Sequence, residues 1–462
     1  MVLSPSPRIL FFYYIIPLQL LASTISGIGF VLSDSRFLLA GFIIWSLWFI
    51  LMFFTTFPIT DKYILKARLY GKIKRGSRII LIFFMVLGIT EIILLCGFHE
   101  SFARLSMEKG TFPKILASFD RGFGYNDGTA LNHQAAINLM SGRNPYTNSN
   151  IIIALLQFKP SADRITALRR GEFSEVFPHP TEEQLEDVWQ KAMKNPWEPR
   201  PEIESSLSYP AGSFLLPIPF LLIGIEDFRL IYLIYILIAL IFVFVILPRD
   251  KRIFFCGALL LSFDLWNCIA NGETGALVFP FLMLAWVLLN RNWWLSAAFM
   301  GVAIAIKQTA WFFIPFYLIT SLKLYRIKNA GYMGLITGGI FLLFNLPFII
   351  DDPSSWFMSV LTPMSRDMFP AGVGLVSLVT SGIWHNNSPL IFNVLELIVF
   401  VTGIIWYYFH VEKYPQTGLL LAILPLFFAW RSLWPYFFYT GLIVLGLILL
   451  DAPLRTGNNC SY

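Results

Sequence analysis

The stretch that decides the fold is residues 226–247, which read EDFRLIYLIYILIALIFVFVIL. After Arg229 no charged residue occurs before Arg249. An apolar run of this length is long enough to cross the hydrocarbon core of a bilayer as one helix. Similar runs recur along the chain, and the sequence therefore predicts an all-α, polytopic integral membrane protein.

The composition supports this class of protein. Of the 462 residues, 56% are hydrophobic and only 13% are charged, and the mean hydropathy is +0.67. Soluble domains carry about 25% charged residues, so most of this surface must face lipid. The net charge of +6 could suit nucleic acid, but the basic residues cluster in short loops between apolar runs, which indicates membrane topology instead.

About twelve transmembrane helices are expected, in an N-terminal hairpin with its basic loop (1–78) and a transmembrane core (79–450), before a short tail (451–462). The predicted spans are 8–32, 37–58, 79–97, 226–247, 253–270, 275–290, 293–306, 309–322, 331–350, 389–409, 418–431 and 435–450.

The orientation follows from the loop 59–78, which is rich in Lys and Arg and holds one acid, Asp61. Basic loops stay in the cytoplasm. Both termini are then expected to be cytoplasmic, and the plasma (inner) membrane is the expected location. The polar residues 98–209 form one large extracytoplasmic loop.

This loop carries signals of ordered structure. Thr181 and Gln184 form a capping box, and Leu185, Val188, Trp189 and Ala192 follow on one helical face. A helix at 181–193 should therefore lie on the bundle or the membrane. A second helix is expected over 131–141. The apolar residues 211–224 hold Pro217 and Pro219, so a re-entrant or interfacial segment is expected there instead of a full span.

Asp127 is the first candidate for chemistry. It stands in a Gly-Tyr-Asn-Asp-Gly turn before an Ala-rich helix, just outside the membrane. A carboxylate there can act as a general base. The alternative is an ordinary solvated turn, where Asp is common, and Asp120 is the rival carboxylate.

Lys307 and Gln308 interrupt the apolar stretches 293–306 and 309–322. A lysine in such surroundings is costly at mid-bilayer, about 2.5–3.5 kcal/mol on insertion scales, and so indicates function. The alternative is a lysine whose ammonium snorkels to the interface.

Two further polar breaks fall on the outer side. One contains Glu273, and the other contains Arg431, Trp434 and Tyr436. The guanidinium fork of an arginine suits a phosphate, whereas Trp and Tyr are common in aromatic belts and Glu273 could belong to a plain hairpin turn. The acids at 351–352, near Arg366, could bind a divalent cation, but the favoured explanation is that they are ordinary helix-end and loop acids. We expect no metal and no cofactor.

These polar positions converge at one membrane face under the predicted topology. A carboxylate, a lysine and an arginine beside one leaflet suit a reaction on a lipid phosphate, whereas transporters place such charges near the midplane.

The same motifs resemble the GT-C superfamily of polyprenyl-phosphate-dependent glycosyltransferases, and most closely glycosyltransferase family 87. The matching positions are Asp127, Ala135-Ala136, the run from Gly142 to Tyr146, Ser208-Tyr209-Pro210, Gly272-Glu273, the run from Gly301 to Lys307, and Trp434. The chain departs from the family pattern at Glu273 and Gly275, where Gln and Asn are expected, and at Gln308, which stands in place of Pro.

The resemblance implies a hexosyltransferase that moves a sugar from a polyprenyl- or dolichyl-phosphate donor to a lipid or glycan acceptor. Mannose is the first candidate for the sugar, and the reaction would invert the anomeric configuration. It implies Asp127 as the base and Lys307 and Arg431 as ligands of the donor phosphate. Tyr146, Glu273, Gln308, Trp434 and Tyr436 would bind substrate. The alternatives are a lipid or solute transporter, or a membrane subunit without chemistry.

Overall fold

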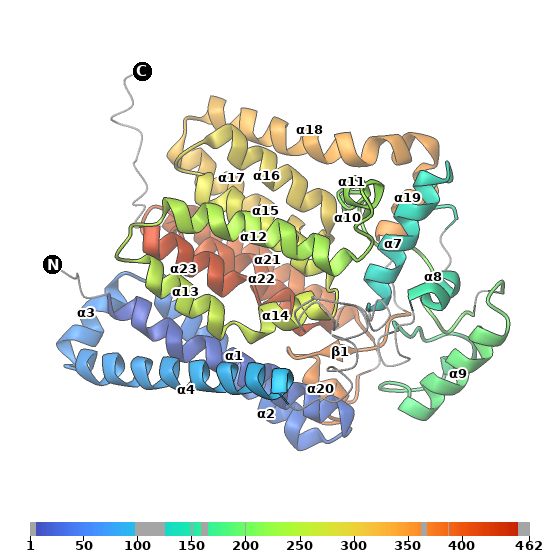
Figure 1. Ribbon diagram of the computed structural model, residues 1–462, viewed down its shortest axis with the longest axis horizontal. Coiled ribbons are helices and arrows are strands. Elements are labelled where there is room, and N and C mark those ends of the chain that lie inside the picture. Colours follow the sequence, from blue (N-terminus) through green and yellow to red (C-terminus); the bar gives the residue numbers. More distant parts are fainter. Residues whose placement is uncertain are drawn as a thin grey trace.

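The computed structural model describes residues 6–97, 125–148, 151–158, 165–198, 200–361, 367–386 and 388–450. Long helices lie side by side in one bundle (Figure 1). The short helix α3 (Ile59–Lys66) lies at one end of the bundle, and α7 (Asp127–Met140), α8 (Ile151–Phe158) and α9 (Glu182–Lys194) gather at the other. This separation is consistent with the predicted placement of the basic loop and the large polar loop on opposite sides.

Within the described residues, five helices are long and apolar enough to cross a membrane: α1 (Pro7–Val31), α2 (Ser35–Thr56), α12 (Phe228–Ile246), α18 (Ile327–Asp351) and α21 (Leu390–His410). A sixth candidate is the pair α13 (Arg252–Leu261) and α14 (Phe263–Ala270), which bends by 56°. The all-α, membrane-type fold is confirmed, and the count of twelve spans stays a prediction.

The remaining apolar helices are α4 (Tyr70–Gly97), α15 (Thr274–Leu288), α16 (Trp293–Ile306), α17 (Phe313–Leu324), α22 (Thr417–Phe427) and α23 (Thr440–Leu450). They are shorter, except α4, which begins with a basic stretch before its apolar part. Every residue of α15 is buried, as expected for a helix that is apolar on all sides. It packs against α12, α16 and α23 and forms the centre of the bundle.

The N-terminal hairpin packs directly on this core. The Phe42 and Phe427 rings stack with centroids 5.8 Å apart, and Trp45 lies 5.4 Å from Phe437. Ser23 donates a hydrogen bond of 2.9 Å to Asp264 on α14. The hairpin therefore supports the segment that holds the last polar motif.

The outer end shows one correction to the expected elements. Helix α7 begins at Asp127, four residues before the predicted start, because the Asn126 side chain accepts a hydrogen bond from the Thr129 amide and caps the helix. Asp127 thus stands in the first turn of a helix and not in a loop. The end of the helix is as predicted, since Gly142 has φ +74°.

The capping box of α9 is confirmed, with Thr181 and Gln184 bonded to each other's backbone. Val188, Trp189 and Ala192 are buried, so this helix lies against the protein as predicted. Its neighbour in sequence is the short 3-10 helix η3 (Gly171–Phe173).

The Pro-rich segment is also as predicted. It forms two short helices, α10 (Gly212–Leu215) and α11 (Ile218–Leu222), which break at Pro217 and do not form a full span. Short elements complete the outer end: α19 (Pro353–Val360), α20 (Ser377–Thr380), η4 (Gln308–Phe312), η6 (Trp434–Tyr436), and a parallel pair of β1 (Ala371–Gly372) with β2 (Arg431–Ser432).

Candidate active site

Lys307 occupies a break between two helices. Helix α16 ends at Ile306, the Lys307 backbone is extended, and η4 follows. The side chain is only 7% exposed, so it does not snorkel to solvent. Its Nζ lies 5.4 Å from the Tyr209 ring centroid and 5.5 Å from that of Tyr436, within the range of cation–π attraction. In the described part of the chain no carboxylate forms an ion pair with this ammonium.

Close backbone packing brings Tyr209 to Lys307. A Cβ at Gly212 would lie 2.6 Å from the Ala305 carbonyl oxygen, so only glycine lets α10 approach the end of α16 this closely. The Gln308 amide adds two ties, donating to the Ser208 carbonyl at 2.5 Å and to the Val360 carbonyl at 2.7 Å. Gln308 therefore fixes the walls of the site here, and its contact with substrate stays a prediction.

Asp127 lies near Tyr209. A Cβ on its neighbour Gly128 would lie 2.6 Å from Tyr209 Oη. The half-buried Asp127 carboxylate accepts one hydrogen bond from the Gly128 amide and one from the Thr166 amide, each of 2.7 Å. The charges of Glu273 and Asp127 act on the Lys307 ammonium. The structure thus places Asp127, Glu273 and Lys307 near one another, and their roles in a reaction stay predictions.

Helix α7 docks on the turn that contains Glu273. The Thr129 hydroxyl donates to the Gly272 carbonyl, and the Asn132 amide donates to Thr274 Oγ1 at 3.2 Å. Glu273 itself is the N-cap residue of α15. This turn is therefore part of the site's frame and not a free surface hairpin.

A buried polar network under α7 was not predicted. The Tyr125 hydroxyl donates to Asp227 at 3.4 Å and accepts from the Phe228 amide at 2.9 Å. Asp227 forms a buried ion pair of 2.6 Å with Arg229. His133 stacks on Phe228 with centroids 4.4 Å apart, and burial lowers its pKa to about 3, so the imidazole is neutral. In the sequence, the one sign of this buried network was the presence of charged residues at the start of the apolar run 226–247.

Arg431 lies near Tyr436. It starts β2, which pairs with β1 in the register Ala371 to Arg431, and its charge acts on Tyr436 and on His179. Burial lowers the pKa of His179, and the Arg431 charge lowers it further. Trp434 opens the same short helix η6 as Tyr436. Both Arg431 and Lys307 thus act on Tyr436, and a role of Arg431 in binding a donor phosphate stays a prediction.

Tyr146 supports the site from outside. Its buried hydroxyl donates to the Tyr209 carbonyl at 2.9 Å, and its role in binding substrate stays a prediction.

The two acids at 351–352 occupy helix-end positions, since Asp351 accepts from Asn144 and Asp352 caps α19. Among the residues that the structure describes, no group of three or more His, Cys, Asp or Glu side chains could hold a metal. Asp120 and Arg366 lie outside the described residues.

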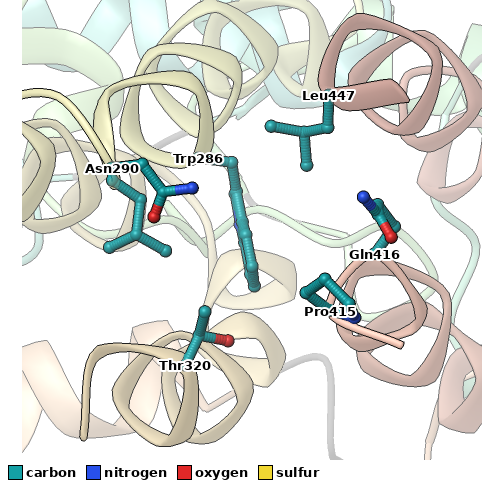
Figure 2. A pocket seen from close by; sticks show the side chains of 7 residues that line it. Trp286, Asn290, Thr320, Pro415, Gln416 and Leu447 are labelled. Carbon is teal, nitrogen blue, oxygen red and sulfur yellow. The ribbon is translucent and has the colours of Figure 1, made fainter. Parts of the chain in front are cut away.

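A small cavity lies at the far end of α15 from this site (Figure 2). Its volume is about 30 Å³, and Trp286, Thr320 and Gln416 are among its lining residues. Ligand pockets measure about 300–1,000 Å³, so this cavity has room for water and not for a sugar.

Comparison with known protein families gives a match over part of the chain. Residues 207–424 match the model of glycosyltransferase family 87. The match confirms the resemblance seen in the sequence, and the class that it supports is a membrane glycosyltransferase. The family 87 segment contains Tyr209, Glu273 and Lys307, whereas Asp127 precedes it and Tyr436 follows it. No curated protein and no solved structure matches the chain.

Proposed function

We propose that the protein is an inverting hexosyltransferase that moves a sugar, with mannose as the first candidate, from a polyprenyl- or dolichyl-phosphate donor to an acceptor hydroxyl. The reaction would take place at the extracytoplasmic face of the plasma membrane, with both termini in the cytoplasm. The acceptor would be a lipid or a glycan. The family 87 match supports the glycosyltransferase class, and the arrangement of charges around Lys307 supports a phosphate-linked donor.

The donor phosphate would bind the Lys307 ammonium. Within the described residues this buried cation has no carboxylate in ion-pair contact, and desolvation makes such a charge costly. It is therefore poised for an anion from outside the chain. The rings of Tyr209 and Tyr436 stabilise this cation in the absence of donor. Arg431 would reach the same phosphate after a small displacement of Tyr436. Two cations suffice for a monophosphate, so the proposed mechanism uses no metal.

Asp127 would act on the acceptor. Its carboxylate takes the proton of the acceptor hydroxyl while the oxygen attacks the anomeric carbon of the sugar. The bond between that carbon and the phosphate oxygen breaks, and the electron pair leaves with the lipid phosphate. Attack opposite the leaving group inverts the anomeric configuration. General-base catalysis typically supplies about 10²–10⁴-fold, and stabilisation of the departing charge by Lys307 is usually the larger contribution.

The observation that carries this proposal is the buried Lys307 ammonium between two tyrosine rings, with Asp127 beside one of them. The test is transfer of labelled mannose from polyprenyl-phosphate mannose to a panel of lipid and glycan acceptors by membranes that contain the protein. Transfer that disappears in both Asp127→Asn and Lys307→Met supports the proposal. If the wild-type protein moves lipid or sugar across the bilayer without forming a glycosidic bond, the transporter alternative is correct.

A further inference from the structure

Three segments of the chain meet at the Tyr125 side chain. Tyr125 lies two residues before Asp127 and is fully buried. Its hydroxyl accepts a hydrogen bond of 2.9 Å from the Phe228 amide and donates to Asp227 at 3.4 Å. The start of α7 is therefore held by α12, a helix that begins 103 residues later in the chain.

The start of α12 is a firm anchor because it carries buried charges. Asp227 caps this helix and forms an ion pair of 2.6 Å with Arg229, which is 4% exposed. The Arg229 guanidinium carbon lies 5.7 Å from the Tyr125 ring centroid, within the range of cation–π attraction. Breaking a buried charge pair is strongly destabilising, so these groups hold the Tyr125 ring and hydroxyl in place.

The turn that contains Glu273 rests on the same residues. Gly272 has φ +65°, and a Cβ there would lie 3.3 Å from Tyr125 Cδ1 and 3.5 Å from Arg229 Cγ. The buried Thr129 hydroxyl donates to the Gly272 carbonyl. Glycine at this position lets the turn lie directly against Tyr125 and Arg229. The position of Glu273 thus depends on the residues that anchor α7.

We propose that Tyr125 is a positioning residue that fixes Asp127 relative to Glu273 by anchoring α7 and the Glu273 turn to the start of α12. The inference rests on the proposed function, since it takes Asp127 as the base. A base must lie within hydrogen-bond reach of the proton that it accepts, and a displacement of about 1 Å can cost about 10²-fold in rate. Tyr125 therefore acts on the reaction through the position of Asp127.

The test variant is Tyr125→Phe, which keeps the ring against Gly272 and Arg229 and removes only the hydroxyl. The matched control is Tyr13→Phe. Tyr13 is 3% exposed, and its hydroxyl donates to the Phe254 carbonyl at 2.9 Å, where α1 packs on α13. Both variants remove one hydroxyl from a buried ring, but only Tyr125→Phe removes it beside α7.

The measurements are kcat for transfer from polyprenyl-phosphate mannose, the Kd of this donor, and the Tm. Both variants should lower the Tm, because each loses hydrogen bonding in the protein interior. Tyr125→Phe should also lower kcat by about 10-fold or more, with an unchanged donor Kd, because the proposed ligand of the donor phosphate is Lys307. Tyr13→Phe should keep normal kcat. Normal kcat in Tyr125→Phe would refute the inference.

A double-variant cycle separates positioning from a general loss of structure. If Tyr125 acts through Asp127, adding Tyr125→Phe to Asp127→Asn should leave the slow residual transfer nearly unchanged, because the group that Tyr125 positions is already gone. A further loss of about 10-fold in the double variant would show an independent effect and count against the inference.

Thr129→Val is a second variant in case Tyr125→Phe does not fold. It removes the hydroxyl that ties α7 to Gly272 and should lower kcat in the same way, so normal kcat together with a lowered Tm would contradict the inference. Full activity of Asp127→Asn would overturn the proposed base itself, whereas normal kcat in Tyr125→Phe overturns only the positioning role.

Discussion

Replacing Asp127 by Asn tests the proposed base most directly. Asn keeps the volume of the side chain but has one acceptor oxygen in place of two. Asp127 accepts from both the Gly128 and the Thr166 amides, so in the variant one backbone N–H faces an amide NH₂. Hydrogen bonds to a charged group contribute about 1.5–3 kcal/mol each, and a loss of this size is expected in the free energy of unfolding.

The catalytic loss should be larger. Removal of a general base costs about 10²–10⁴-fold in kcat, which corresponds to about 2.7–5.4 kcal/mol in the activation free energy. The assay is single-turnover transfer of labelled sugar under saturating donor, together with the Tm of the purified protein. Donor affinity should change little, because the proposed ligand of the donor phosphate is Lys307 and not Asp127.

The control is Asp352→Asn, which removes a carboxylate from the N-terminus of α19, where it accepts from the Ser355 amide and hydroxyl. This variant should lose stability to a similar extent and keep normal kcat. If Asp127→Asn keeps kcat within about 10-fold of the wild type, Asp127 is not the base. A large loss in Asp120→Asn with little change in Asp127→Asn would assign that role to Asp120.

Three further predictions follow from the same geometry. Lys307→Met should lower kcat/KM for the donor by about 10–100-fold, with partial rescue in Lys307→Arg. The control is Lys323→Met, which removes a lysine of α17 that pairs with Glu412 and should be neutral in the transfer assay. If Lys307→Met keeps normal turnover, the ammonium does not bind the donor. Trp189→Asp should lower the free energy of unfolding by about 3 kcal/mol or more, and the exposed Gln190→Asp on the same helix should not; equal Tm values would show that α9 does not pack on the protein. Cysteines at the exposed positions 62 and 66 should resist an impermeant thiol reagent added from outside, and cysteines at positions 186 and 190 should react; the reverse pattern would overturn the predicted orientation.

Local signals in the sequence were enough to predict several elements correctly. The capping box at Thr181 needs only its own turn, and the break at Pro217 follows from a missing backbone donor. The cost of placing Lys307 in apolar surroundings indicated a site before any contact was known. The start of α7 was predicted four residues too late, because the Asn126 cap stands in a Gly-Tyr-Asn-Asp-Gly stretch whose composition is also typical of a turn.

Contacts between distant segments could not be predicted. Nothing near Gln308 indicates that its amide donates to Ser208 and Val360. The Tyr125 hydroxyl meets Asp227 across more than a hundred residues of chain, and the Thr166 amide donates to Asp127 across 39 residues. Such residues carry no periodicity or motif of their own, because their role depends on the packing of whole helices.

The enclosure of the Lys307 ammonium has a consequence for biosynthesis. One ring, Tyr209, is translated well before α16, and the other, Tyr436, comes just before the final helix α23. A chain still on the ribosome therefore lacks the second of the two tyrosine rings around Lys307 until almost all of it has emerged. Under the proposed function, nascent chains should not bind the donor lipid productively, and a premature stop after Leu433 should leave most of the bundle in the membrane as an inert protein.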